Sequence, residues 1–152
     1  MPVVKTGLYM NWVNVTVTPQ GGSVLNVDGV TALSPMRASR QEAFYGDARQ
    51  FVRLIKNVEK KRSVTIQSAN IGILQQIPDD TPCTVTATLL DPRNGIATGG
   101  GAITVTLLNA VLEKDGTEAQ NNKYAGGQAV FNAMGVVDTD GVESDPLTYE
   151  FV

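Results

Sequence analysis

The 152-residue sequence predicts a mainly β protein, a β-sandwich or barrel of about eight strands with one short flanking α-helix. Segments in which apolar and polar residues alternate recur along most of the chain, which is the pattern of half-buried strands. Gly, Pro, Asn and Asp separate almost all of these segments, as in antiparallel sheets with tight connections. Only one segment has helical spacing, so a fold built from alternating strands and helices is not expected. The length suits one domain with its own core, over residues 1–152.

The strand segments follow one another in a regular order. The first, NWVNVTVTP at 11–19, alternates valines with Asn and Thr and ends before a Gly-Gly turn. In the second, VLNVDGVTAL at 24–33, the pair Asp28-Gly29 is typical of a hairpin or a bulge. The others are FVRLIKNV at 51–58, RSVTIQSA at 62–69, CTVTATLLDP at 83–92, GAITVTLLNAVL at 101–112, GQAVFNAMGVV at 127–137 and LTYEFV at 147–152.

The predicted helix is SANIGILQQI at 68–77, with Ser68 or Asn70 as its N-cap. Ile71, Leu74 and Ile77 are spaced to form one apolar face, and a proline follows at once. Two segments fit neither pattern. SPMRASRQEAF at 34–44 has no clear period, which predicts a long basic loop around 35–60, and DTDGVESDP at 138–146 predicts an acidic loop.

Charge is divided unevenly between the two halves of the chain, although the net charge is only -3. Residues 1–76 hold nine Lys/Arg and four Asp/Glu, a net charge of +5, whereas residues 77–152 hold three and eleven, a net charge of -8. Eight of the twelve bases fall between Arg37 and Arg62. Such a division is typical of a nucleic-acid surface or of two surfaces that meet in an assembly.

The composition argues against an enzyme. The chain has no histidine and a single cysteine, which removes Ser-His and Cys-His nucleophile pairs and histidine metal sites. Cys83 lies on an apolar strand phase, where we expect it to pack as a small hydrophobic residue. We therefore predict no catalytic residues, no metal and no cofactor. The acidic run 138–145 lacks the spacing of a calcium loop, and the segment ATGGGAI lacks the Lys and Ser/Thr of a phosphate loop. No apolar run is long enough to span a membrane or to serve as a signal peptide, so an intracellular chain is expected.

One strand has two apolar phases. From 102 to 107 apolar residues alternate with Ala and Thr, but from Leu108 the other phase also turns apolar, with Ala110 and Leu112. A bulge near Leu107 and Leu108 would keep a single buried face, whereas a regular strand would need the helix or a second subunit to cover its other face. The division of charge favours the subunit. Opposite charges on different surfaces give a head-to-tail contact, which generates rings or open stacks.

The basic stretch from Arg37 to Arg62 has two explanations. Phe44, Tyr45 and Phe51 lie among its bases, as in proteins that bind nucleic acid, but a strand core would also place aromatic residues there. Docking on the acidic surface of another copy is the interpretation we prefer. The residues expected to pair across that contact are Arg37, Arg40, Arg49 and Arg53 on one side and Asp138, Asp140, Glu143 and Asp145 on the other.

From about Val13 to Leu147 the chain resembles phage tail tube proteins. The resemblance rests on the order of elements: a long loop after the first hairpin, KKRSVTIQSANIGIL as strand then helix, a central TVTATLLDPRNGIATGGGAITVTLLNAVL, and a closing YAGGQAVFNAMGV. It implies a β-sandwich with a flanking helix, hexameric rings that stack into a tail tube partly through the long loop, other tail proteins as partners, and DNA passing through the lumen without specific binding. It also implies a virion tail protein that is assembled in the host cytoplasm. Thr104, Thr106, Leu108, Ala110 and Leu112 would then belong to an inter-subunit or lumen-lining sheet.

Three other functions are compatible with this sequence. A capsid-decorating or neck protein, or the tube of a phage-like secretion device, would have similar composition. A sugar- or cell-binding β-sandwich module would need exposed aromatic residues on one sheet face, whereas Trp12 and the four tyrosines are scattered.

Overall fold

The computed structural model describes residues 11–47, 50–90, 102–118 and 126–151. Within these ranges the chain is mainly β, as the sequence predicts, and has one short helix. The elements are β1 (Asn11–Pro19), β2 (Leu25–Asn26), β3 (Val30–Tyr45), β4 (Val52–Ser68), the 3₁₀ helix η1 (Ile71–Gln76), β5 (Cys83–Leu90), β6 (Ala102–Glu118), β7 (Gly126–Ala133), β8 (Val136–Val137), β9 (Glu143–Ser144) and β10 (Leu147–Phe151).

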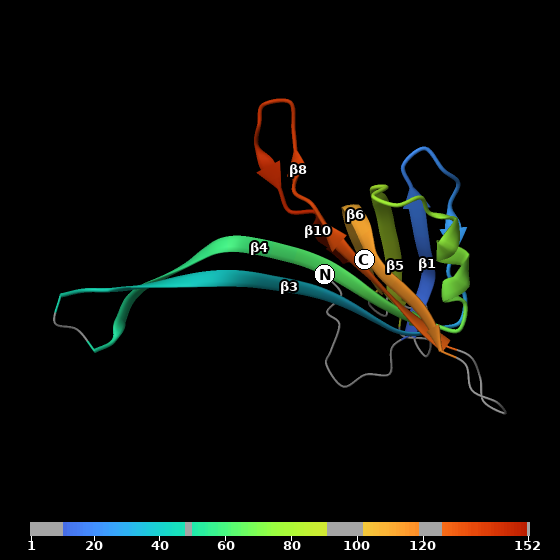
Figure 1. Ribbon diagram of the computed structural model, residues 1–152, viewed down its shortest axis with the longest axis horizontal. Coiled ribbons are helices and arrows are strands. Elements are labelled where there is room, and N and C mark those ends of the chain that lie inside the picture. The colour runs from blue at the N-terminus through green and yellow to red at the C-terminus, as the bar shows by residue number, and fades with distance from the viewer. Residues whose placement is uncertain (1–10, 48–49, 91–101, 119–125, 152) are drawn as a thin grey trace.

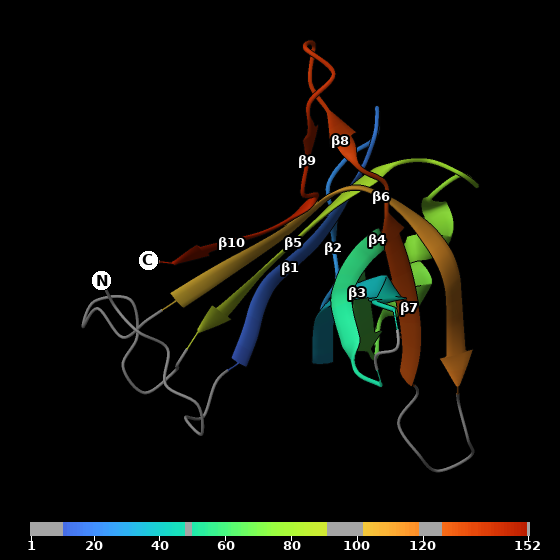
Figure 2. The same ribbon diagram turned by 90° about the vertical axis from the view of Figure 1, so that its left-hand side faces the viewer.

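The sheet is a single antiparallel one that folds over at β6. Its strand order is β2-β1-β5-β6-β7-β4-β3, and β10 also pairs with β6. The first half of β6 pairs with β5 and β10, whereas its second half pairs with β7. Figure 2 shows β6 arching from one layer into the other. The result is a sandwich-like fold, and the strands of the described ranges do not close into a barrel.

A β-bulge explains most of the second apolar phase of β6. Leu108 and Asn109 together lie opposite one residue of β5, and Asn109 has a φ of 57°, a left-handed conformation that asparagine adopts more readily than most residues. The bulge shifts the alternation, so Leu107 and Ala110, three positions apart, are both fully buried in the core. Of the two explanations that the sequence allowed, the bulge accounts for this part of the strand.

The core lies between the two layers and draws side chains from both. Its fully buried members include Val17, Val64, Ile66, Leu107, Phe131 and Leu147. Cys83 is buried among them, as expected for a small hydrophobic residue, and its burial raises the pKa of the thiol. Burial of such side chains stabilises the fold by roughly 1.5–3 kcal/mol each.

The predicted helix is present but is a 3₁₀ helix of six residues rather than an α-helix over 68–77. Its buried residues Ile71 and Leu74 and the buried C-cap residue Ile77 are spaced by three. That spacing fits a helix with three residues per turn, in which positions i and i+3 are eclipsed. Asn70 is the N-cap residue, but its side chain makes no capping bond.

The segment predicted as a long basic loop is instead a β-hairpin. β3 and β4 pair from Val30 with Ser68 to Tyr45 with Val52, with register shifts after Val30, Arg40 and Phe44, although β7 supports β4 only as far as Arg62. In the segment 38–61, here called the arm, the described residues 38–47 and 50–61 therefore extend beyond the rest of the sheet, and Figure 1 shows them projecting from the body of the molecule. Both faces of the arm meet solvent, so its sequence lacks the alternation that reveals a half-buried strand.

Candidate assembly surfaces

The tip of the arm (residues 43–47 and 50–55) is apolar on both faces. Residues paired across a hairpin point to the same side, which places Phe44 with Leu54 on one face. The opposite face carries Tyr45 with Val52, and Ala43 with Ile55. The large side chains of the tip are exposed, and Phe51 is 83% exposed. Monomeric proteins rarely expose such a contiguous apolar surface, so the tip is a candidate contact site.

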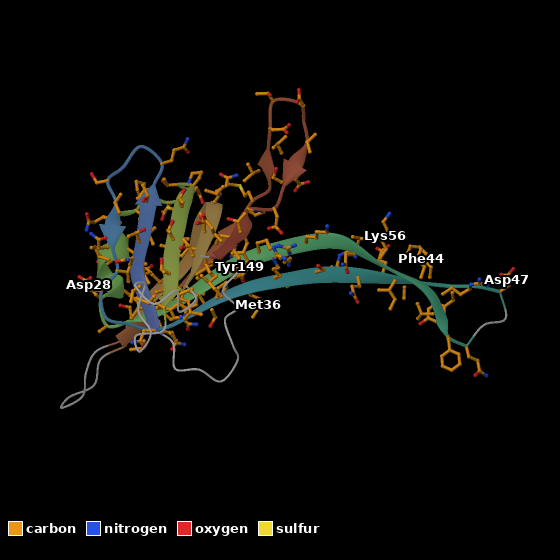
Figure 3. The ribbon with its side chains drawn as sticks, turned by 180° about the vertical axis from the view of Figure 1, so that it is seen from behind. Asp28, Met36, Phe44, Asp47, Lys56 and Tyr149 are labelled. Carbon is orange, nitrogen blue, oxygen red and sulfur yellow. The ribbon has the colours of Figure 1, made fainter. Side chains whose placement is uncertain are left out.

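The stem of the arm (residues 38–42 and 56–61) is charged. The Arg40 guanidinium lies 3.3 Å from the carboxylates of both Glu42 and Glu59, and the Lys61 ammonium lies 3.7 Å from Glu59. These ion pairs are exposed, and such pairs contribute only about 0–1 kcal/mol each. Figure 3 shows Lys56 and Phe44 far along the arm, away from Asp28 at the other end of the molecule.

The root of the arm is fixed to the C-terminal strand by a compact ionic cluster around Asp145. Nε of Arg62 donates to both carboxylate oxygens of Asp145 at 3.1 Å, and the Arg62 side chain is only 12% exposed. Arg37 forms a second ion pair with Asp145 at 3.3 Å and donates to the carbonyl oxygen of Leu147. The Arg37 guanidinium also lies over the Tyr149 ring, 5.8 Å from its centre. The cluster therefore sets the direction in which the arm leaves the body.

The carboxylate of Asp145 has a lowered pKa. Desolvation raises the pKa, but the Leu147 N–H, the hydrogen bond from Arg62 and the charges of Arg62 and Arg37 stabilise the ionised form and outweigh it. Asp145 is therefore ionised throughout the neutral range.

The acidic segment predicted as a loop contains a small second hairpin, β8–β9, which projects from the body on the same side as the arm root (Figure 1). Asp138 closes its turn, because its Oδ1 accepts hydrogen bonds from the N–H groups of Asp140 and Val142. The exposed apolar side chains Val137 and Val142 lie on this hairpin. Residues 134–146 hold four acids and no base.

The residues predicted for ring stacking fall into four groups. Arg37 and Asp145, predicted to pair between copies, pair with each other within the chain. Arg40 is engaged by Glu42 and Glu59 of its own stem. Arg53 at the tip and Asp138, Asp140 and Glu143 on β8–β9 belong to none of the ion pairs found in the described residues. Arg49 lies outside those residues.

Threonines cover the outer face of the layer formed by β1, β5, β10 and the first half of β6. One row runs across four strands as Thr16, Thr86, Thr106 and Thr148 in register. A second row contains Thr88, Thr104 and Glu150. The opposite phase of these strands, which includes Val17, Val85 and Leu107, is buried in the core. These four segments contain no Lys or Arg.

The predicted lumen residues divide at the bulge in β6. Thr104 and Thr106 lie on the threonine face, and Leu108 at the bulge is exposed. Ala110 is fully buried and Leu112 packs against the core, so neither presents its side chain to a neighbour or a channel. The five residues do not share one face of the sheet, because the bulge at Leu108 and Asn109 shifts the alternation. Their place in an inter-subunit or lumen sheet stays a prediction.

Sequence reasoning treated Phe51, Leu54 and Ile55 as part of an ordinary strand. It assigned the contact made by this region to its arginines and not to these apolar side chains. The signal was present, because FVRLIKNV at 51–58 is apolar on both strand phases. A strand core is now excluded for Phe44, Tyr45 and Phe51, since all three are exposed.

No three His, Cys, Asp or Glu side chains in the described ranges lie close enough together to hold a metal ion. The helix found there is also too short to cross a membrane.

Comparisons with known proteins show the fold. No family model matches the sequence, and none of the curated proteins does. Among solved structures, a chain of "Cryo-EM structure of the anti-feeding prophage (AFP) baseplate, 6-fold symmetrised" is similar, with a TM-score of 0.54 and 10% sequence identity. The match covers 100% of this chain and 97% of that one. The two chains therefore share an overall fold along their whole length.

Proposed function

We propose that this protein is a structural subunit of a phage tail or phage-tail-like particle. Its copies form hexameric rings that stack head to tail into a tube, and DNA passes through the lumen. Three observations support the proposal: the resemblance in the order of elements, a fold shared with a chain of a six-fold symmetrised prophage baseplate, and the arm. The role is mechanical, with no catalysis.

The arm carries most of this argument. Its tip exposes six large apolar side chains, and burying each would contribute roughly 1.5–3 kcal/mol. The body contains its own core, and the tip of the arm does not pack against it. We therefore expect the exposed apolar side chains of the tip to pack against a second molecule.

Charge supports another copy as that second molecule. The arm holds six Lys/Arg and three Asp/Glu, a net charge of +3, whereas the rest of the chain holds six and twelve, a net charge of -6. A basic arm is thus attracted to the acidic body of a neighbour. Because the two surfaces differ, the contact is heterologous, and repetition generates rings or stacks rather than closed pairs.

The threonine face is our candidate for the channel wall. Each phosphate paired with Lys or Arg adds affinity through counterion release, so a conduit for DNA must lack bases on its wall. A face of threonine hydroxyls with one acid, Glu150, meets that requirement. We assign Thr86, Thr104, Thr106 and Thr148 to this wall.

Electron microscopy of the purified chain at high concentration tests the proposal. We expect rings and tubes of uniform width from the wild type. Phe51→Asp should abolish stacking, and Val24→Asp, which places the same charge at an exposed valine of the body, should not. A monodisperse monomer at millimolar concentration contradicts the proposal.

A baseplate ring is the second candidate, favoured by the fold that this chain shares with a chain of a prophage baseplate. Isolated hexameric rings that never stack would select it over a tube. Trimers bound to a capsid lattice would instead select a decorating protein.

A further inference from the structure

The last cross-strand pair before the arm consists of two like charges. Arg37 of β3 lies directly opposite Arg62 of β4, and Arg62 is the residue nearest the arm that still pairs with β7. Beyond this pair, β3 and β4 pair only with each other in the described ranges. Two positive charges opposite one another weaken a strand pair. A negative charge placed between them therefore stabilises the hairpin at the point where it leaves the sheet.

Asp145 supplies that negative charge from the segment before β10. Its two carboxylate oxygens accept hydrogen bonds from Arg62 at 3.1 Å, and the Arg37 guanidinium lies 3.3 Å away. Arg62 also donates to the carbonyl oxygens of Ala38 and Lys61, the residues at which the arm begins on each strand. One carboxylate thus joins both strands of the hairpin at the root of the arm.

The same cluster holds the start of β10. Among the described strands β10 pairs with β6 alone, so its other edge is open. Both backbone groups of Leu147 are engaged by the cluster, because the N–H donates to Asp145 at 2.9 Å and the C=O accepts from Arg37 at 3.3 Å. The Arg37 guanidinium also lies over the ring of Tyr149, which Figure 3 shows at the root of the arm. β10 is therefore held by β6 on one edge and by the arm root on the other.

The alternation of an antiparallel strand identifies the residues of β10 that depend on β6. The carbonyl oxygen of Pro146, just before the strand, accepts a hydrogen bond from β6. Thr148 and Glu150, two and four residues further on, therefore face β6 as well. A five-residue strand with one partner strand opens locally more easily than a strand paired on both edges. The amides of Thr148 and Glu150 thus report how firmly β10 is held.

We infer that Asp145 couples the arm to β10, so that the direction of the arm and the order of the strand change together. Arg37 is the second link, because it contacts Asp145, the Leu147 carbonyl and the Tyr149 ring. The coupling is a property of the single chain and goes beyond the proposed function. Where the proposed function holds, β10 carries Thr148 of the channel wall, so fixing the arm also orders that part of the wall.

The direction of the arm can be measured in the dilute, monomeric chain by double electron–electron resonance. Nitroxide labels at Val24→Cys on the body and Phe44→Cys on the arm report the distance between the two parts, and both positions are exposed. Cys83 is buried and remains as in the wild type. We expect Asp145→Asn to broaden the distribution of this distance, because the amide carries no charge to hold the two guanidiniums.

Hydrogen exchange measures the order of β10 in the same variant. We expect Asp145→Asn to accelerate exchange of the Thr148 and Glu150 amides about tenfold or more. Leu147 is fully buried in the core, so the strand stays attached to the body while its later residues open. The matched control is Asp140→Asn, an acid with no ion pair among the described residues, which should change neither measurement.

Two further variants distinguish coupling from two independent losses. Tyr149→Ala changes only β10, yet it should broaden the distance between body and arm. Arg62→Gln changes only β4, yet it should accelerate exchange of the Thr148 and Glu150 amides. Arg40→Gln removes a guanidinium of the same hairpin that pairs within the stem, and it should leave both measurements unchanged.

The inference is overturned if Asp145→Asn changes only one of the two measurements, or if Tyr149→Ala and Arg62→Gln each affect only their own element. If Asp145→Asn does not fold, Tyr149→Ala and Arg62→Gln decide the matter by themselves. Neither result bears on the proposed function, which is tested by the formation of rings and tubes. A chain that shows the coupling but never assembles contradicts the proposed function alone.

Discussion

The body and the arm contain the same kinds of apolar residue, but the body buries these side chains and the arm exposes them. Phe131 is fully buried at the centre of the body, whereas Phe51 at the tip is 83% exposed. The body is thus specified by its own core. The arm keeps its strand pairing yet leaves its apolar side chains for another molecule. This difference shows that a run of apolar residues in the sequence indicates a packing contact but not whether the contact lies within the chain or with another molecule.

Truncating these two phenylalanines should give the largest contrast. Phe131→Ala should lower the free energy of unfolding by about 3–5 kcal/mol, because it leaves a cavity in a packed core. Phe51→Ala should change it by less than about 0.5 kcal/mol in the dilute monomer. Urea unfolding followed by circular dichroism measures both. Equal losses would show that the tip packs on its own body and would remove the basis of the comparison.

The junction between body and arm should be next in sensitivity. Asp145→Ala removes the partner of Arg62, a largely buried guanidinium, and should cost about 1.5–3 kcal/mol. Asp140→Ala, an acid of the same segment with no ion pair among the described residues, should cost less than about 0.5 kcal/mol. The same unfolding assay compares them. Similar values for the two variants would mean that the cluster does not hold the root.

The bulge in β6 should respond to substitution at about the same scale or slightly less. Asn109 has a positive φ that β-branched residues rarely adopt, so Asn109→Val should cost about 1–2 kcal/mol. Asn109→Gly tolerates that φ but loses the hydrogen bond from Asn109 Nδ2 to the Gly135 carbonyl, so it should cost less than valine, about 0.5–1 kcal/mol. Thermal unfolding of the two variants provides the measurement, and a harmless valine would show that the strand can run without the bulge.

The body could be predicted further from its sequence than the arm, for a physical reason. Alternating Val and Thr identified β1, β5 and the first half of β6, because one face of each meets the core and the other does not. The arm has solvent on both sides, so residues 38–45 carry no alternation and were expected to form a loop. The apolar pattern of β6 allowed a bulge near Leu108 but did not decide for it, because that choice depends on the backbone conformation of Asn109.

Of the candidate contact surfaces, the sequence predicted only the charge. The sequence indicated basic and acidic surfaces and named Arg53, Asp140 and Glu143 among the contact residues. It did not separate these from Arg37 and Asp145, because their pairing within the chain depends on the segment before β10 lying close to β3 in the fold. The apolar tip was missed because a run such as FVRLIKNV is equally typical of a core strand.

The junction should weaken in acid and be insensitive to pH near neutrality. The pKa of Asp145 is lowered in the folded chain, so its contribution to stability is fully present above the ordinary value of 3.8 and is lost as the pH falls through the lowered pKa. The stability difference between wild type and Asp145→Ala should therefore be constant near neutrality and shrink below about pH 4. Urea unfolding across that range measures it, and a difference that does not shrink at all below pH 4 would exclude the ion pairs as its source.

The smallest effect on the monomer should come from the stem. Arg40 pairs with Glu42 and Glu59, but all three side chains are about half exposed or more, and such pairs are screened by water and salt. Arg40→Ala should therefore change the free energy of unfolding by less than about 0.5 kcal/mol. Arg40→Glu should be nearly as mild in the monomer, although it places three acids together.

Any larger effect of Arg40→Glu on ring stacking then arises from contact between copies, because the stability of the monomer does not depend on the residue. Sedimentation velocity at low and high protein concentration separates the effect on the monomer from the effect on ring stacking. A loss above about 1 kcal/mol in the dilute monomer would mean that the stem is stabilised by its own ion pairs, and the arm would then resemble the body in supplying its own stability.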